Sequence, residues 1–368
     1  MLTSIGVNSP QAVKRWGLGL ATDTAKQMYF TRFTSTGQNS IIEQKTELEE
    51  DAGDEVSFDL SMRLRGDMTF GDNVVEGSEE ALTFYQDKVR IDQMRKGASG
   101  GGAMTRKRTL HDLRMVAKDR LGEYFAEYMD EIHFVYLSGD ASFSAINQDT
   151  KFARTFAGNP VEAPDSDHIL YGGAATSKAT LTAADRMSIA LLERIGVKPR
   201  MMNAVNPDVV KMSPVSVEGG KHFVLLMSPF QGFQIRTEVG DLSWSKITQA
   251  LYQGSRKNNP ICQDGLGMYN NLILHEHENV RRFGDYGAGS NVQAARALLL
   301  GRQAGVIAHG QGGRKGARYN WVEKKHDADN QLAVYAGTIC GFKKTRYNGK
   351  DFGVTAIDTA CVDPNAVA

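Results

Sequence analysis

The residues best suited to bind a metal ion lie in one short string, His275-Glu276-His277-Glu278. If this string forms a strand, His275 and His277 point to the same face, because side chains alternate along a strand, and imidazole is a common zinc ligand. The string does not match HExxH, however, and neither a cysteine nor a third histidine follows at a recognisable spacing. A solvated or intersubunit polar face is therefore the better interpretation. A metal-dependent hydrolase centred on these two histidines is the enzyme alternative.

A glycine-rich string, Ser99-Gly100-Gly101-Gly102, is the second candidate for chemistry, because a glycine loop before a helix can cradle a phosphate group. Neither GxxxxGK[ST] nor GxGxxG after a strand occurs here, so a flexible hinge at Gly100, Gly101 and Gly102 is the better interpretation. The chain also lacks the GxSxG motif of a serine nucleophile. We therefore expect no catalytic residue, no cofactor and no bound metal ion.

The composition is that of an ordinary globular protein. The chain has 368 residues, of which 41% are hydrophobic, and 43 basic residues balance 43 acidic ones. No net charge therefore draws it to nucleic acid or to a membrane surface. Three separated cysteines, Cys262, Cys340 and Cys361, form no CxxC pair and fit a reducing compartment. Residues 1–10 do not resemble a signal peptide, and no apolar run approaches the roughly 20 residues of a membrane-spanning helix.

Charge is balanced overall but segregated into two blocks. Residues 86–120 carry ten basic and four acidic side chains, whereas residues 43–59 carry eight acidic and one basic. Opposed blocks of this kind favour pairing between neighbouring subunits. The alternatives are that the basic block faces DNA, or that both blocks are unrelated solvated surfaces. The candidates for intersubunit ion pairs are Arg63, Arg65, Arg90 and Arg95 against Glu47, Glu49, Glu50 and Asp54. A partly exposed pair among them would contribute at most about 1 kcal/mol.

A long hairpin is expected between the two blocks. Residues 56–65 alternate strictly between apolar and polar side chains, which predicts a half-buried strand. A connection containing several Gly and Asp residues follows, and residues 82–95 predict the returning strand. A two-stranded hairpin is not stable alone in water, so residues 56–95 must find their core on a neighbouring surface. We therefore expect an assembly.

One long amphipathic helix follows the glycines. It is expected to begin at Thr109, where Thr109 and Asp112 form a helix start signal, and to run to about Tyr136. The dipeptide Asn348-Gly349 predicts the turn of a second hairpin. The other expected elements are a helix starting at 182–185, a helix at 291–303, and strands at 221–227, 232–237, 269–275, 332–339, 341–346 and 352–357.

Several residue strings accompany these elements along nearly the whole chain. They are Asn39-Ser-Ile-Ile42 with Thr46-Glu-Leu-Glu49, Glu79-Glu-Ala-Leu-Thr-Phe84 with Ile91-Asp-Gln93, Gly267-Met-Tyr269 with Leu274-His-Glu-His-Glu278, Leu300-Gly-Arg-Gln-Ala-Gly305, and Gly341-Phe-Lys-Lys-Thr-Arg-Tyr-Asn-Gly-Lys-Asp-Phe-Gly353 with Ala356-Ile-Asp-Thr359. The pattern resembles the Hong Kong 97-type capsid proteins of tailed bacteriophages, and most closely the major capsid proteins of the N-four type short-tailed phages. The resemblance is weakest over residues 140–180.

The resemblance implies an α+β protein with the Hong Kong 97-type capsid fold. It divides the chain into an N-terminal arm at 1–53, an E-loop hairpin at 54–102, a spine helix with the first part of the P-domain at 103–150, an A-domain at 151–315, and the terminal strands of the P-domain at 316–368. The glycine triplet would be the hinge that lets the hairpin re-seat when the shell expands.

The function implied by the resemblance is that of a major capsid protein, which is structural and not an enzyme. Such subunits form pentamers and hexamers that close into an icosahedral shell around double-stranded DNA, which the inner face contacts without sequence specificity. The expected partners are further copies of the chain, a separate scaffolding protein and a portal, with a decoration protein allowed and no membrane involved. The subunit would belong to the virion, after assembly in the cytoplasm of the bacterial host. An encapsulin-like compartment shell shares the fold and is the alternative.

Overall fold

The computed structural model describes residues 20, 22–49, 52–62, 64, 66–77, 79–140, 156–205, 209–217, 220–238, 261, 265–311 and 318–365. Residues 20 and 22–27 are helical, and the other α-helices of this part are α2 (Ala103–Arg108), α3 (Leu113–Ser138), α4 (Ile189–Val205) and α5 (Pro229–Thr237). Its 3₁₀ helices are η1 (Tyr29–Phe33), η2 (Glu47–Glu49), η3 (Ser166–His168) and η4 (Lys178–Thr180). Across the residues just given, none of the helices is long and apolar enough to cross a membrane.

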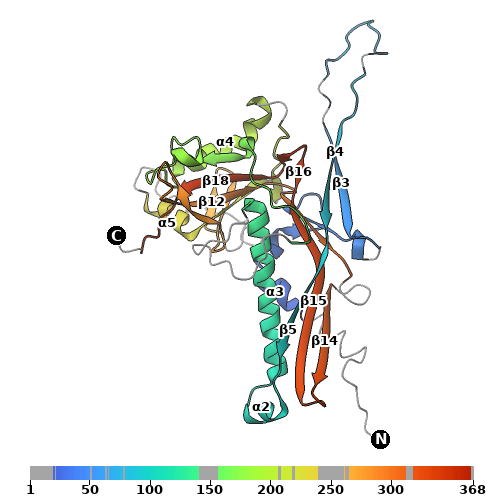
Figure 1. The fold of residues 1–368 in the computed structure, drawn as a ribbon. Helices are drawn as coiled ribbons and strands as arrows, with labels where there is room; N and C mark the ends of the chain where they lie inside the picture. The colour runs from blue at the N-terminus through green and yellow to red at the C-terminus, as the bar shows by residue number, and fades with distance from the viewer. Residues whose placement is uncertain are drawn as a thin grey trace.

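Two larger sheets organise the described part of the chain (Figure 1). The six-stranded sheet has the order β1 (Thr34–Ser35), β2 (Ile42–Lys45), β13 (Gly305–His309), β15 (Gln331–Lys344), β14 (Tyr319–His326), and β5 (Asp92–Ser99) also pairs with β15. The eight-stranded sheet has the order β6 (Ile169–Tyr171), β18 (Val354–Ala360), β12 (Val292–Leu300), β8 (Gly220–Met227), β10 (Leu272–Glu276), β9 (Gly267–Tyr269), with β11 (Arg282–Tyr286) on β12 and β7 (Val215–Val217) on β8. Two small ladders pair β3 (Glu55–Ser61) with β4 (Phe84–Arg90) and β16 (Arg346–Tyr347) with β17 (Lys350–Asp351).

The long helix α3 runs beside β5 and β15 and ends at the eight-stranded sheet (Figure 1). It begins after Asp112, whose carboxylate accepts hydrogen bonds from Arg114 N at 3.0 Å and Met115 N at 3.4 Å. The predicted start at Thr109 is therefore four residues too early, because Thr109 instead ends α2. The helix stops at Gly139, which takes a left-handed conformation with φ of 66°.

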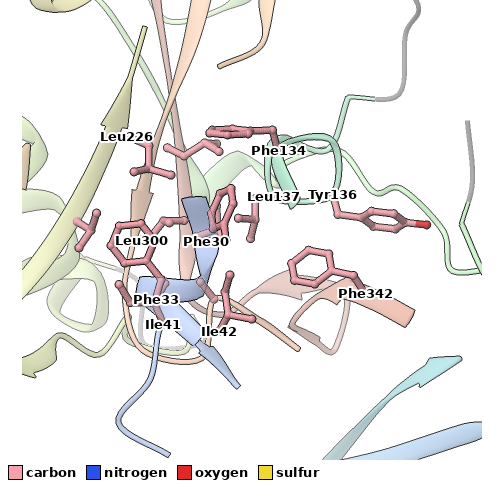
Figure 2. Packing of buried hydrophobic residues seen from close by; sticks show 14 of the residues in the cluster. Phe30, Phe33, Ile41, Ile42, Phe134, Tyr136, Leu137, Leu226, Leu300 and Phe342 are labelled. Carbon is pink, nitrogen blue, oxygen red and sulfur yellow. The ribbon is translucent and has the colours of Figure 1, made fainter. Parts of the chain in front are cut away.

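The main core lies where the end of α3 meets both sheets and the N-terminal segment (Figure 2). Phe30 and Phe33 of η1 share this cluster with Phe134 of α3, Leu300 of β12 and Phe342 of β15, and all five are nearly inaccessible to solvent. Burying each such side chain stabilises the fold by roughly 1.5–3 kcal/mol. Segments far apart in the sequence are therefore held together by one apolar cluster.

A buried carboxylate holds η1 against α3. The Asp130 Oδ2 atom accepts a hydrogen bond from Tyr29 N at 2.8 Å, and Oδ1 accepts one from Phe30 N at 3.2 Å. Burial raises the pKa of Asp130 to about 7, although these two donors act to lower it. The group therefore binds its proton more tightly in the folded chain than in the unfolded chain.

A buried charge network joins α3 to the eight-stranded sheet. Arg296 of β12 is bidentate to Asp358 of β18, with Nε–Oδ1 at 2.7 Å and Nη2–Oδ2 at 2.8 Å. Arg296 Nη1 also donates to Ser138 O at 3.0 Å, and Tyr286 Oη donates to Asp358 Oδ2 at 2.7 Å. Burial and the adjacent Asp358 charge raise the pKa of Tyr286. The buried cation is thus compensated by a partner on the neighbouring strand.

Two predicted elements are wrong in type. The expected helix at 291–303 is strand β12, which lies between β18 and β8 and is buried from Ala294 to Leu300. A strand buried on both faces reads as a continuous apolar run, and such a run does not distinguish strand from helix. The expected strand at 232–237 belongs to helix α5. Ser228 and Gln231 form a capping box there and Pro229 opens the helix, which are sequence signals for a helix start.

Other predictions differ from the structure only at their boundaries. The helix expected from 182–185 begins at Ile189, because Asp185 Oδ2 instead accepts hydrogen bonds from Thr182 N and Oγ1 in a local turn. The strands expected at 332–339 and 341–346 are largely one strand, β15. The turn at Asn348-Gly349 is confirmed, since both residues have left-handed φ values of 51° and 71° between β16 and β17.

Candidate assembly surfaces

The distal part of the hairpin projects from the body of the molecule (Figure 1). Strands β3 and β4 pair along their whole length, from Glu55↔Arg90 to Ser61↔Phe84. Every described residue from Leu64 to Phe84, here called the hairpin tip, is exposed. Met68 is 80% exposed and Phe70 is 74% exposed. Large apolar side chains grouped on a surface in this way mark an interaction site.

The base of the hairpin packs on its own molecule. Val89 of β4 is buried against Val306 and Ala308 of β13, and Val56 and Phe58 of β3 cover the same cluster. Strand β5, which continues from β4, pairs with β15 over its whole length. The expectation that residues 56–95 find no core in their own molecule is therefore wrong for the base and for β5. The described residues of the hairpin tip have no such core, and their packing on a neighbour stays a prediction.

A buried ion pair fixes the base of the hairpin to β15. The Asp87 Oδ1 atom of β4 contacts Lys343 Nζ and accepts a hydrogen bond from Lys88 N at 2.8 Å, while Oδ2 accepts one from Arg346 N at 3.0 Å. Only 7% of the Asp87 side chain and 12% of the Lys343 side chain are exposed. The carboxylate is thus compensated by one cation and two backbone donors, which set the direction in which the hairpin leaves the body.

Two further features hold the chain where β4 passes into β5. Asn159 Oδ1 accepts a hydrogen bond from Arg90 N and Asn159 Nδ2 donates to Arg90 O, both at 2.9 Å. The same carbonyl oxygen of Arg90 lies where a Cβ atom on residue 341 would stand, so only Gly341 allows the two backbones to approach this closely. Asn159 and Gly341 therefore together fix the position at which the chain crosses β15.

The residues predicted to form intersubunit ion pairs differ in their surroundings. Arg90 pairs with Glu55, and Glu49 pairs with Arg318 at 2.8 Å, so both already have partners within the chain. Of the other described members, Glu47, Asp54 and Arg95 are exposed. The members that lie outside the described residues are Arg63, Arg65 and Glu50. A role of these residues between subunits stays a prediction.

The glycine triplet lies at the far end of β5, where the chain turns into α2. Gly100 N donates to Leu332 O at 2.7 Å, and Gly101 has a left-handed φ of 70°. Gly102 precedes α2, whose first residue donates its N–H to Asn330 Oδ1 at 3.0 Å. The whole of β5 separates the triplet from the hairpin. The hinge role stays a prediction, and a rotation at the triplet would move α2 first.

His275, one of the two histidines considered as zinc ligands, is a core side chain, whereas His277 is half-buried. His275 of β10 is fully buried, with Nε2 at 2.8 Å from Ile261 O and its ring edge-on to Phe33. The ring of His277 lies 4.5 Å from that of Tyr29, and burial lowers the pKa of His277 to about 4. A solvated face is therefore the wrong interpretation for His275, whereas Glu278 is exposed and an intersubunit role of the string stays a prediction. Within the part of the chain that the structure describes, no three His, Cys, Asp or Glu side chains gather into a group able to hold a metal ion.

Sequence reasoning missed Asp87 and Asn159. Asp87 counted only as one acidic residue inside a basic block, and Asn159 lay in the stretch where the resemblance is weakest. A signal for Asp87 was available, because it lies two residues from Val89 and so shares the buried face of the strand. A carboxylate on a buried face indicates a buried partner. No comparable local signal marks Asn159.

Comparisons with known proteins match this architecture over nearly the whole chain. A family model described as phage capsid protein matches residues 4–363. The major capsid protein of Pseudomonas phage KPP25 is 27% identical over 375 aligned residues, which cover 94% of each protein. The capsid of Ralstonia phage GP4 is 49% identical, covers 100% of both chains and has a TM-score of 0.84.

A more distant structure extends the likeness of fold. The capsid of cyanophage Pam1 is 23% identical, covers 92% of this chain and 93% of its own, and has a TM-score of 0.71. The predicted α+β class and Hong Kong 97-type capsid fold are confirmed by these matches, which favour neither an encapsulin-like compartment nor a metal-dependent hydrolase. This chain therefore belongs to the phage capsid protein family and is a structural subunit of a phage shell.

Proposed function

We propose that this major capsid protein forms pentamers and hexamers, which close into an icosahedral shell around double-stranded DNA. The observation that carries the proposal is the exposed hairpin tip, whose apolar side chains lack cover from the described part of their own chain. A tip that packs on an adjoining copy makes a heterologous contact, in which one surface meets a different surface of the next copy. Such contacts repeat around a ring and between rings, and they do not stop at a dimer.

The base of the hairpin supports the proposal because its contacts hold the hairpin in one orientation relative to β15. The buried pair of Asp87 and Lys343 and the close crossing at Gly341 hold the hairpin at a fixed angle to β15. A hairpin held at one angle to its own body brings the tip of each copy to a similar place on its neighbour, whether the ring has five members or six. Rings of defined symmetry need this repetition.

The other parts of the proposal concern partners and domains. We assign the shell a scaffolding protein and a portal, with a decoration protein allowed, and packaged DNA on its inner face without sequence specificity. Assembly takes place in the cytoplasm of the bacterial host, and the subunit has no catalytic activity. The division into N-terminal arm, E-loop hairpin, spine helix, A-domain and terminal P-domain strands (1–53, 54–102, 103–150, 151–315 and 316–368) belongs to the same proposal.

Electron microscopy of the protein, expressed with the scaffolding protein of the same phage, tests the shell directly. We expect closed particles with five-fold and six-fold capsomers from the wild type. In a matched variant, Asn-Gly replaces residues 63–82, so that Met62, whose N–H already bonds to Thr83 O, closes a two-residue hairpin. This variant should stay folded by circular dichroism and form no shells. Wild-type protein that stays monomeric would contradict the proposal, as would normal shells from the variant.

A further inference from the structure

The hairpin tip is acidic as well as apolar. Its sequence holds five carboxylates against one arginine. The carboxylates, all exposed, are Asp67, Asp72, Glu76, Glu79 and Glu80. The large exposed apolar side chains of the tip are Leu64, Met68, Phe70, Val74, Val75, Leu82 and Phe84. A surface that receives this tip must therefore combine apolar side chains with positive charge.

The basic segment, residues 103–120, has this combination. It comprises α2, the link to α3 and the first turns of α3, and carries six Lys or Arg side chains against two Asp. Its large exposed apolar side chains are Met104, Leu110, Met115 and Val116. Lys107 and Arg108 of the last turn of α2 are exposed, whereas Arg114 and Lys118 are paired with carboxylates of their own chain. The positive charge offered to another molecule is therefore concentrated next to the apolar patch.

The acidic block at residues 43–59 fits the basic segment less well than the tip does. Glu43, Glu49 and Glu55 pair with cations of the same chain. Glu47 and Asp54 remain exposed, but no large exposed apolar side chain accompanies them within the described residues between 43 and 61. Of the two acidic stretches, the tip therefore matches the basic segment in both charge and hydrophobicity.

The tip and the basic segment lie at opposite ends of the molecule, with the lengths of α3 and β15 between them (Figure 1). They cannot meet within one copy. We propose that the hairpin tip of one copy docks on the basic segment of an adjoining copy, with its apolar side chains on Met104 and Leu110 and its carboxylates facing Lys107 and Arg108. This inference rests on the proposed shell, for which it names the receiving surface.

Charge reversal on each side, and on both together, tests the contact. One variant carries Lys107→Glu and Arg108→Glu, a second carries Asp67→Lys and Asp72→Lys, and a third carries all four changes. Each single-sided variant should stay folded by circular dichroism and lower the yield of closed shells by about tenfold or more. The combined variant should recover to within about threefold of the wild type, because the reversed charges attract again.

A control variant with Lys211→Glu and Lys221→Glu makes the same change in net charge at exposed sites outside the basic segment. It should assemble as the wild type does. Equal loss in this control, or no recovery in the combined variant, would overturn the contact. A Lys107→Glu, Arg108→Glu variant that forms normal shells but retains less DNA would overturn it too, by assigning the segment to nucleic acid. Absence of shells from the wild type would count against the proposed function instead.

Discussion

Replacing Asp87 by Asn should loosen the base of the hairpin without changing its shape. Asn has the same size, but it removes the charge that faces Lys343 and replaces one of the two accepting oxygens with an amide donor. Breaking a buried pair leaves the remaining charge uncompensated, which costs about 3–5 kcal/mol. Because 12% of the Lys343 side chain reaches solvent, we expect a loss near the lower end, about 3 kcal/mol in the free energy of unfolding.

A double-mutant cycle with Lys343→Met isolates the pair. Urea unfolding of unassembled wild type, both single variants and the double variant gives the four free energies. The double variant should lose about 1–3 kcal/mol less than the sum of the single losses. Hydrogen exchange in Asp87→Asn should accelerate in β3 and β4 while β18 stays protected, since the hairpin base opens without the eight-stranded sheet.

A control on the same hairpin is Glu55→Gln. This partly exposed carboxylate lies between Lys88 and Arg90, whose hydrogen bonds, Lys88 first, lower the pKa of Glu55. Solvent screens both pairs, so we expect little change in stability and normal assembly. The stability losses of Asp87→Asn and Lys343→Met could instead sum to the loss of the double variant within about 0.5 kcal/mol. That result would refute the role of the Asp87–Lys343 pair as the anchor of the hairpin.

Three further predictions concern the body of the subunit. Asp358→Asn leaves the buried Arg296 cation without its charge partner and should cost about 3 kcal/mol or more in urea unfolding; a loss under about 1 kcal/mol would contradict this. The Asp130 carboxyl, with its pKa raised to about 7, lowers stability increasingly as pH rises from about 4 to about 7. The free energy of unfolding of Asp130→Asn should therefore rise by about 3 kcal/mol relative to that of the wild type as the pH is raised from about 5 to about 8. The same pH dependence of stability in both proteins would argue against this prediction. Alanine at Gly100, Gly101 and Gly102 should leave the subunit folded but reduce closed shells in electron micrographs, and a normal particle yield would refute the hinge role.

The parts of the fold that carry a regular local pattern were predictable. Alternating side chains marked β3, and the Asn348-Gly349 turn identified the small hairpin before β18. Strand β12 was not predictable from its period, because burial on both faces removes the alternation. Helix α5 was missed although Ser228 and Pro229 signalled its start.

The assembly surfaces were predictable in character and less so in detail. The pattern of the hairpin predicted that it lacks a core in its own molecule, yet the structure shows exposure only at the tip, because Val89 reaches a core formed by β13. The contacts that orient the hairpin join residues distant in sequence, such as Asp87 with Lys343 and Arg90 with Asn159. Local patterns do not encode such pairings. They depend on tertiary packing.

Oxidative footprinting of Met68 measures directly whether an adjoining copy covers the hairpin tip. Met68 is 80% exposed in the single subunit, and a thioether this accessible reacts readily with oxidants. Free subunits and purified shells are exposed to the same dose of hydroxyl radicals, and mass spectrometry gives the rate of sulfoxide formation at Met68. We expect the rate in shells to fall by about tenfold relative to free subunits, since contact with a neighbour excludes solvent. An equal rate in both states would show that the tip stays bare after assembly and would contradict the role assigned to it.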